Sequence, residues 1–142
     1  MNIPRRSRFL VLFLYLFAFG GFATEQPQYR LLLQVSENSA PRLNLALNNA
    51  RNAQSAFGAE NIAVEIVVFG PGVNTLTHFA PKHIVDKVEK AVEAGIRIMA
   101  CENSIRAFQL SAQELLSGIG YVKSGVAELV KKQSRGWSYI RP

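Results

Sequence analysis

The chain has 142 residues, and 16 Lys and Arg residues against 10 Asp and Glu residues give it a formal net charge of +6. A chain of this length is enough for one domain with a modest core. Three of the bases lie within the first eight positions, and the others are dispersed apart from Lys131, Lys132 and Arg135. This distribution lacks the basic stripe of a nucleic-acid-binding surface, so we expect no nucleic-acid partner.

The first 23 residues differ from the rest of the chain. Arginines at positions 5, 6 and 8 precede an uninterrupted apolar run over residues 9–19, which is shorter than the roughly 20 residues that cross a bilayer as a helix. Gly21 and Ala23 then place small residues at the −3 and −1 positions of a cut before Thr24. The layout predicts a secretory signal peptide over residues 1–23 and a single exported, periplasmic domain over residues 24–142.

Two other interpretations of this segment stay open. If it is not cleaved, it anchors the protein to the membrane, whereas the mature domain is expected to have no membrane association. The paired arginines also match part of a twin-arginine signal, but Arg8 stands where that signal prefers an apolar residue. Cleavage removes three of the 16 bases and none of the 10 acids, so the net charge falls from +6 to +3 in the remaining 119 residues.

Five apolar runs are typical of buried strands, and the first three are rich in Leu, Val and Ile. They cover residues 29–35, 62–70, 96–101, 119–123 and 137–141. Between them, apolar residues at helical spacing predict four helices, over residues 39–58, 81–95, 105–115 and 124–136. This alternation predicts an α/β fold, in which helices cover both faces of a mostly parallel sheet of about five strands.

The patterns also predict which side chains face the core. In the first helix the apolar stripe extends from Leu43 to Phe57, and in the fourth helix Val126, Leu129 and Val130 are expected to point inward. Glu65 interrupts a strand that otherwise reads as buried. We therefore expect it at a rim of the sheet or at an interface.

In open parallel sheets, ligands bind beyond the carboxyl ends of the strands. Here that edge collects Asn38 after the first strand, a long irregular loop over residues 70–83 after the second, and Cys101 after the third. His78 and His83 in the loop are candidates for proton donors or for groups that orient a thiolate, although lone histidines are more often surface residues. Neither histidine has metal-ligand spacing, so we expect no metal and no cofactor.

Cys101 is the only cysteine in the chain, so no intrachain disulfide forms. It precedes Asn103 and Ser104, the expected capping residues of the third helix, and a thiol at a helix N-terminus is stabilised as thiolate. Neighbouring arginines would add to this effect, and Glu102 would oppose it. The alternative is that Cys101 is a small buried hydrophobe, which is a common fate of a free cysteine.

Four segments together resemble the DsrE/DsrF-like (YchN-like) family, in particular its small exported members. They are "NNARN" (48–52), "VEIVVFGPGV" (64–73), "ACENSIRA" (100–107) and the ending "GYVKSGVAELVKKQSRGWSYIRP" (120–142). The resemblance implies a three-layer α/β/α fold and a homotrimer or homohexamer. It also implies that a cysteine after the third strand, here Cys101, carries sulfur as a persulfide and passes it to a thiol or sulfur-acceptor protein.

Three hypotheses follow. In the first, the protein is a sulfur relay that uses Cys101, with surrounding binding residues Asn38, His78, His83, Asn103 and Ser104. In the second, it is a non-enzymatic oligomeric module that binds a small ligand or a partner at the strand edge, and Cys101 only packs. In the third, Cys101 forms an intermolecular disulfide.

Overall fold

The computed structural model describes residues 26–142, so the predicted signal peptide lies outside the described residues. The domain is built on one five-stranded sheet in the order β4-β3-β2-β1-β5, and every neighbouring pair is parallel. The strands are β1 (Tyr29–Val35), β2 (Ile62–Val68), β3 (Arg97–Cys101), β4 (Gly120–Val122) and β5 (Ser138–Ile140). The predicted fold class is therefore confirmed, with a sheet that is parallel throughout.

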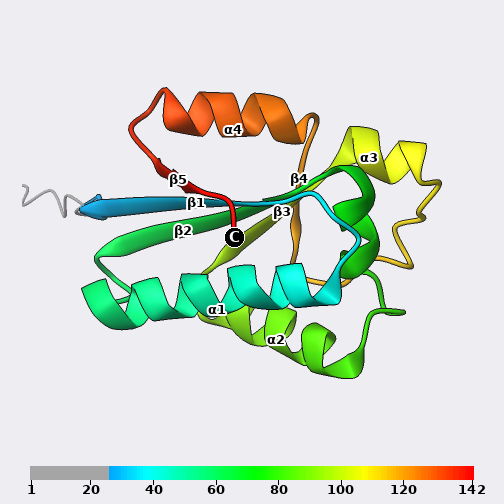
Figure 1. Cartoon of the computed structure of the whole chain (residues 1–142), viewed down its shortest axis with the longest axis horizontal. Helices are drawn as coiled ribbons and strands as arrows, with labels where there is room; N and C mark the ends of the chain where they lie inside the picture. The colour runs from blue at the N-terminus through cyan, green and yellow to red at the C-terminus, as the bar shows by residue number, and fades with distance from the viewer. Residues whose placement is uncertain (1–25) are drawn as a thin grey trace, which may run out of the picture.

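Helices form a layer on each face of the sheet (Figure 1). α1 (Ala40–Phe57) and α2 (Lys82–Glu93) cover one face, and α4 (Gly125–Gln133) covers the other. Parallel strands require a crossover between them, and this connection carries the chain through the helical layers. None of the helices within residues 26–142 is long and apolar enough to cross a membrane.

The main core lies between the sheet and the α1–α2 layer. Alternate residues of each strand point to the same face, so every second side chain enters this core. The strands contribute Leu31, Leu33, Val35, Val64, Ile66, Val68, Ile98 and Ala100. The helices contribute Leu43, Ala46, Leu47, Ala50, Ile84, Val88 and Ala91.

The core beneath α4 is smaller and contains charge. Its buried apolar residues are Leu32, Val67 and Leu129. Glu65 also points to this side and is 0% exposed, although it was expected at a rim or interface; that expectation is wrong. β2 is the central strand, and Lys132 from α4 reaches in to place Nζ 2.7 Å from Glu65 Oε2.

Two further contacts support this buried ion pair. Arg97 on the neighbouring strand β3 places Nη2 3.3 Å from the same carboxylate oxygen. Lys132 Nζ also lies 4.3 Å from the centre of the Trp137 ring, where the face of the indole attracts a cation. A buried carboxylate is tolerated only when cations of this kind compensate for its lost hydration.

Three apolar side chains that were expected to face the core lie at the surface instead. Val126 and Val130 are 56% and 62% exposed, because Gly125, Leu129 and Lys132 form the inner face of α4. Phe57 is also exposed, at the end of α1, where its ring stacks on Tyr29 with 4.2 Å between ring centres.

Two segments between the strands differ from the expected elements. The helix expected over residues 105–115 is α3 (Glu102–Ala107), which starts and ends earlier. Gln109 has a left-handed backbone with φ of +55°, which ends the helical path, and Leu115 forms an antiparallel bridge with Thr77. The loop expected after β2 contains an ordered 3-10 helix, η1 (Gly70–Leu76).

We expect the Lys132→Met variant to lower the free energy of unfolding by about 3 kcal/mol, because it keeps the aliphatic stem but removes the main partner of the buried Glu65 carboxylate. Urea denaturation of wild type and variant measures the loss. The matched control is Lys131→Met, whose side chain pairs with Glu128 at the surface and should cost less than about 1 kcal/mol. Equal losses in the two variants would contradict the prediction.

Candidate functional site

The carboxyl ends of β1, β2 and β3 meet at the edge of the sheet beside η1 and α3 (Figure 1). Cys101 is the last residue of β3 and also the N-cap residue of α3. The expected caps, Asn103 and Ser104, lie inside the first turn instead, because the helix begins at Glu102. The Cys101 side chain is only 4% exposed.

Burial and nearby polar groups act in opposite directions on the pKa of Cys101. Burial raises the pKa of the thiol, but hydrogen bonds from the Ser104 hydroxyl and from the backbone N–H groups of Ser104, Gly125 and Asn103 outweigh it. The pKa of Cys101 therefore lies below its ordinary value. Because these groups stabilise the negative charge, they increase the share of thiolate, which is the nucleophilic form of cysteine.

Ser104 is oriented by the chain segment that follows β2. The backbone N–H of Gly70 donates to Ser104 Oγ at 2.7 Å. Because that oxygen already accepts one hydrogen bond, its own proton is free to point at the Cys101 sulfur. The thiol has one weaker alternative, a contact of 3.9 Å from Sγ to the Lys123 carbonyl oxygen.

Gly125 also lies at the candidate site, and the sequence analysis did not identify it. It is the first residue of α4, so Cys101 faces the N-terminus of this helix as well as that of α3. A Cβ at position 125 would lie 2.7 Å from Phe69 Cβ, which is too close for any side chain. The available signal was Ser124, whose hydroxyl caps α4 by accepting from the Ala127 N–H. It predicts a helix N-terminus after the fourth strand.

The nearby arginines have other partners. Arg97 pairs with Glu65, which lies directly beside it on β2. Arg106 donates to the Asn103 side chain and lies 4.0 Å from Glu102 at the surface. The thiolate is therefore stabilised by hydrogen bonds and helix N-termini, and the expected contribution of the arginines has no contact to support it.

His78 and His83 both have exposed side chains. His78 follows η1, and its backbone N–H donates to the Glu114 carbonyl oxygen at 2.9 Å. His83 lies in the first turn of α2, in the layer on the other side of the sheet from α4. Among residues 26–142, no side-chain hydrogen bond joins either histidine to Cys101.

Asn38 lies at a different feature of the same edge, a cavity of about 320 Å³. The start of α1, the end of η1 and the segment before α2 form its walls. Its lining residues are Asn38, Ala40, Asn74, Thr75, Thr77, Phe79, Ala80, Pro81 and Leu110. Of the predicted site residues, the structure thus brings Asn103 and Ser104 to Cys101 and places Asn38 at the separate cavity.

The described part of the chain contains no group of three or more His, Cys, Asp or Glu side chains arranged to hold a metal ion.

A family model described as the DsrE/DsrF-like family matches residues 30–142. The chain belongs to the DsrE/DsrF-like family. The match covers all five strands, apart from the first residue of β1, and all of the helices that carry the site. Among curated proteins, none matches the chain.

Solved structures show the same fold. The protein MTH1491 from Methanobacterium thermoautotrophicum, described as of unknown function, is 32% identical with a TM-score of 0.73, over 80% of this chain and 99% of that one. YchN from E. coli has a TM-score of 0.64 at 12% identity, over 82% of this chain and 100% of its own. BT1422 from Bacteroides thetaiotaomicron has a TM-score of 0.59 at 14% identity, over 80% and 94%. The last two similarities show the fold alone.

We expect the Ser104→Ala variant to have a higher Cys101 pKa, because it removes a donor that stabilises the thiolate. At neutral pH a smaller share of the thiol is then ionised, and the rate of alkylation by iodoacetamide should fall about fivefold, the effect of one lost hydrogen bond. The rate is measured across a pH series. Ser55→Ala, an exposed position on α1, is the control and should leave the pH midpoint unchanged.

Proposed function

We propose that this member of the DsrE/DsrF-like family carries sulfane sulfur as a persulfide on Cys101. The observation that supports the proposal is the set of donors around Sγ: the Ser104 hydroxyl and the N–H groups of Asn103, Ser104 and Gly125, which lower the pKa of the thiol. A sulfur carrier needs a nucleophilic thiolate, and a lowered pKa increases the share of the thiol that is ionised at neutral pH.

The transfer requires one cysteine and no change in any other group. The Cys101 thiolate attacks a sulfur atom of a hydrogen polysulfide, a new bond forms from Sγ to that sulfur, and the adjacent S–S bond of the polysulfide breaks. The electron pair of the broken bond leaves on a polysulfide one sulfur shorter, which keeps the proton. In the second step an acceptor thiolate attacks the outer sulfur and forms a bond to it. The bond from Sγ to the outer sulfur breaks, and its electron pair returns to Sγ, which regenerates the Cys101 thiolate.

Burial of the sulfur bears on both steps. Cys101 is 4% exposed, so a donor must be small or must approach along one direction. An S–S bond is about 2.05 Å long, so the outer sulfur of the persulfide extends beyond Sγ toward a partner. The same donors that hold the thiolate are available to stabilise the negative charge of the persulfide.

The low exposure of Cys101 also supports a second candidate function. In this alternative the thiol is a packing residue, and the protein is a non-enzymatic oligomeric module that binds a small ligand or a partner at the strand edge. This alternative predicts that the thiol reacts with iodoacetamide only after the protein is unfolded.

Incubation of the native protein with sodium polysulfide should add one sulfur-sized increment to the intact mass, and dithiothreitol should remove it. The expected result depends on Cys101 as the single thiol, so the Cys101→Ser variant is the control. An equal mass increment in the Cys101→Ser variant would refute persulfide formation on Cys101. So would a wild-type protein that gains no increment while folded and gains one only after unfolding. The second outcome would support the packing alternative.

We also propose that the protein is exported to the periplasm and forms a homotrimer or homohexamer there, which receives a thiol or sulfur-acceptor protein as partner. The basic and apolar layout of residues 1–23 supports export. Exposed apolar side chains on α4 and on the edge strand β5, among them Val126, Val130 and Ile140, support association.

Native mass spectrometry of protein recovered from the periplasmic fraction tests both proposals. The expected subunit begins at Thr24, and the expected assembly contains three or six subunits. A subunit that retains residues 1–23 in the membrane fraction would favour the uncleaved anchor, and a monomer would contradict the assembly.

A further inference from the structure

The cavity beside Asn38 has walls that the backbone holds in place. On one side, the Leu116 N–H donates to the Leu76 carbonyl oxygen at 2.9 Å and the His78 N–H donates to Glu114 at 2.9 Å. The Ala80 N–H donates to the Thr77 carbonyl oxygen at 3.0 Å. The cavity is therefore preformed, which is usual for sites that bind small molecules.

Three polar side chains in the wall already donate hydrogen bonds to backbone carbonyl oxygens. Thr75 Oγ1 donates to the Gly72 carbonyl oxygen at 2.7 Å, and Thr77 Oγ1 donates to the Asn74 carbonyl oxygen at 3.0 Å. Asn74 Nδ2 donates to the Pro71 carbonyl oxygen at 2.9 Å. The hydroxyl oxygens and Asn74 Oδ1 keep free lone pairs, so these groups can serve a ligand as acceptors.

None of the nine residues that line the cavity, all within residues 26–142, carries a charge. A charged ligand would lose its hydration there without an opposite charge to compensate for it. The rim adds Asn38, whose amide both donates and accepts.

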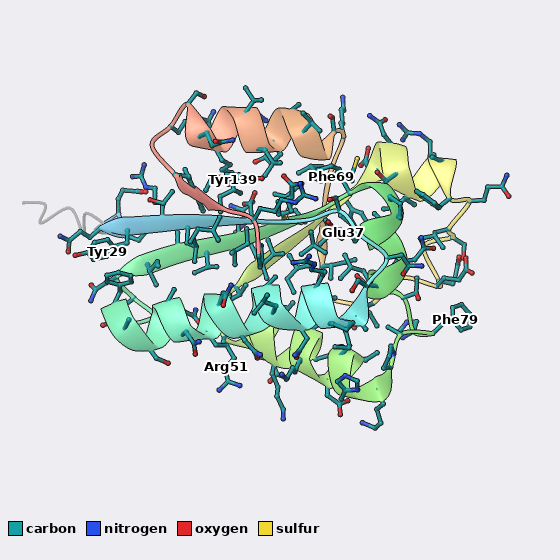
Figure 2. All side chains as sticks on the ribbon, viewed as in Figure 1. Tyr29, Glu37, Arg51, Phe69, Phe79 and Tyr139 are labelled. Atoms are coloured by element: carbon teal, nitrogen blue, oxygen red, sulfur yellow. The ribbon has the colours of Figure 1, made fainter. Side chains whose placement is uncertain are left out.

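An aromatic ring stands at the mouth. Phe79 is 80% exposed and projects from the segment between η1 and α2, away from the body of the domain (Figure 2). Its backbone neighbours are fixed by the hydrogen bonds of His78 and Ala80. An exposed ring beside the cavity offers a flat apolar face on which a planar group can stack.

We propose that this cavity is a binding site for a small, neutral, planar molecule that carries N–H donors, such as an aromatic amide or an uncharged heterocycle. The wall oxygens of Asn74, Thr75 and Thr77 accept from its N–H groups, and the exposed Phe79 side chain, which adjoins the cavity, supplies a ring on which the molecule stacks. A volume of about 320 Å³ is at the lower end for ligand sites, which restricts the ligand to roughly one or two rings.

The site is separate from Cys101, which does not line the cavity. Binding is therefore expected to persist in the Cys101→Ser variant. Loss of persulfide chemistry and loss of ligand binding are thus independent outcomes.

Benzamide is a suitable probe because it is neutral and planar and has two N–H donors. Titration into the ¹⁵N-labelled protein, followed by NMR, should give saturable shifts of backbone signals in residues 74–80. N,N-dimethylbenzamide, which lacks the donors, and benzoate, which carries a charge, should each bind at least about fivefold more weakly. No saturable shifts with benzamide, shifts confined to another region, or equal affinity for the three compounds would overturn the proposal.

Two variants test the assigned contacts. Thr77→Val removes an acceptor at nearly constant volume, and Phe79→Ala removes the exposed ring without disturbing the core; each should weaken benzamide binding about fivefold. Ser55→Ala, at an exposed position on α1 outside the cavity, should leave the affinity unchanged. If Thr77→Val does not fold, Phe79→Ala decides, and unchanged affinity in that variant overturns the proposal.

Discussion

The ion pair between Glu65 and Lys132 sets the position of α4, and the thiol site depends on that position. Lys132 can reach the carboxylate on the central strand only if one face of α4 turns toward the sheet. Gly125 and Leu129 lie on that same face, at intervals of four and three residues. The contact that satisfies a buried charge near the middle of the sheet thus also directs the N-terminus of α4 toward Cys101.

The parallel sheet supplies the second constraint. Because all five strands run the same way, the residues that follow them gather at one edge, and crossover helices begin there with their N-H groups directed back toward the strands. Cys101 benefits from two such helix starts, α3 in sequence and α4 in space. A residue without a side chain is required where these elements converge, because a Cβ at Gly125 would clash with the Phe69 side chain.

Local pattern was sufficient for the features that a short stretch of sequence encodes. The apolar runs identified all five strands, and the end of the third run placed Cys101 at the strand edge. The pattern failed where a distant residue decides the outcome. Glu65 was assigned to a rim because its partner Lys132 is 67 residues away and no local pattern indicates the pair. Val126 and Val130 were assigned to the core because they are apolar, whereas the charged Lys132 is the residue of α4 that faces inward.

Backbone conformation explains the other misses. The left-handed residue Gln109 ends α3 early, yet glutamine carries no signal for that conformation. The chain that leaves α3 then brings Leu110 to the wall of the cavity that Asn38 also lines, although the two residues are more than 70 positions apart. The proximity of Asn38 to the edge was predictable from strand ends, whereas its separation from Cys101 was not.

The 3-10 helix η1 connects the two features of the edge. Its first residue, Gly70, donates the hydrogen bond that orients Ser104 beside the thiol, and its later residues Asn74 and Thr75 line the cavity on the other side. Gly72 fixes the element between these ends, because its N–H donates to the Ser36 carbonyl oxygen and a Cβ there would lie 2.9 Å from the Val35 carbonyl oxygen. One short segment, held against the end of β1, therefore determines the geometry of both the sulfur site and the cavity.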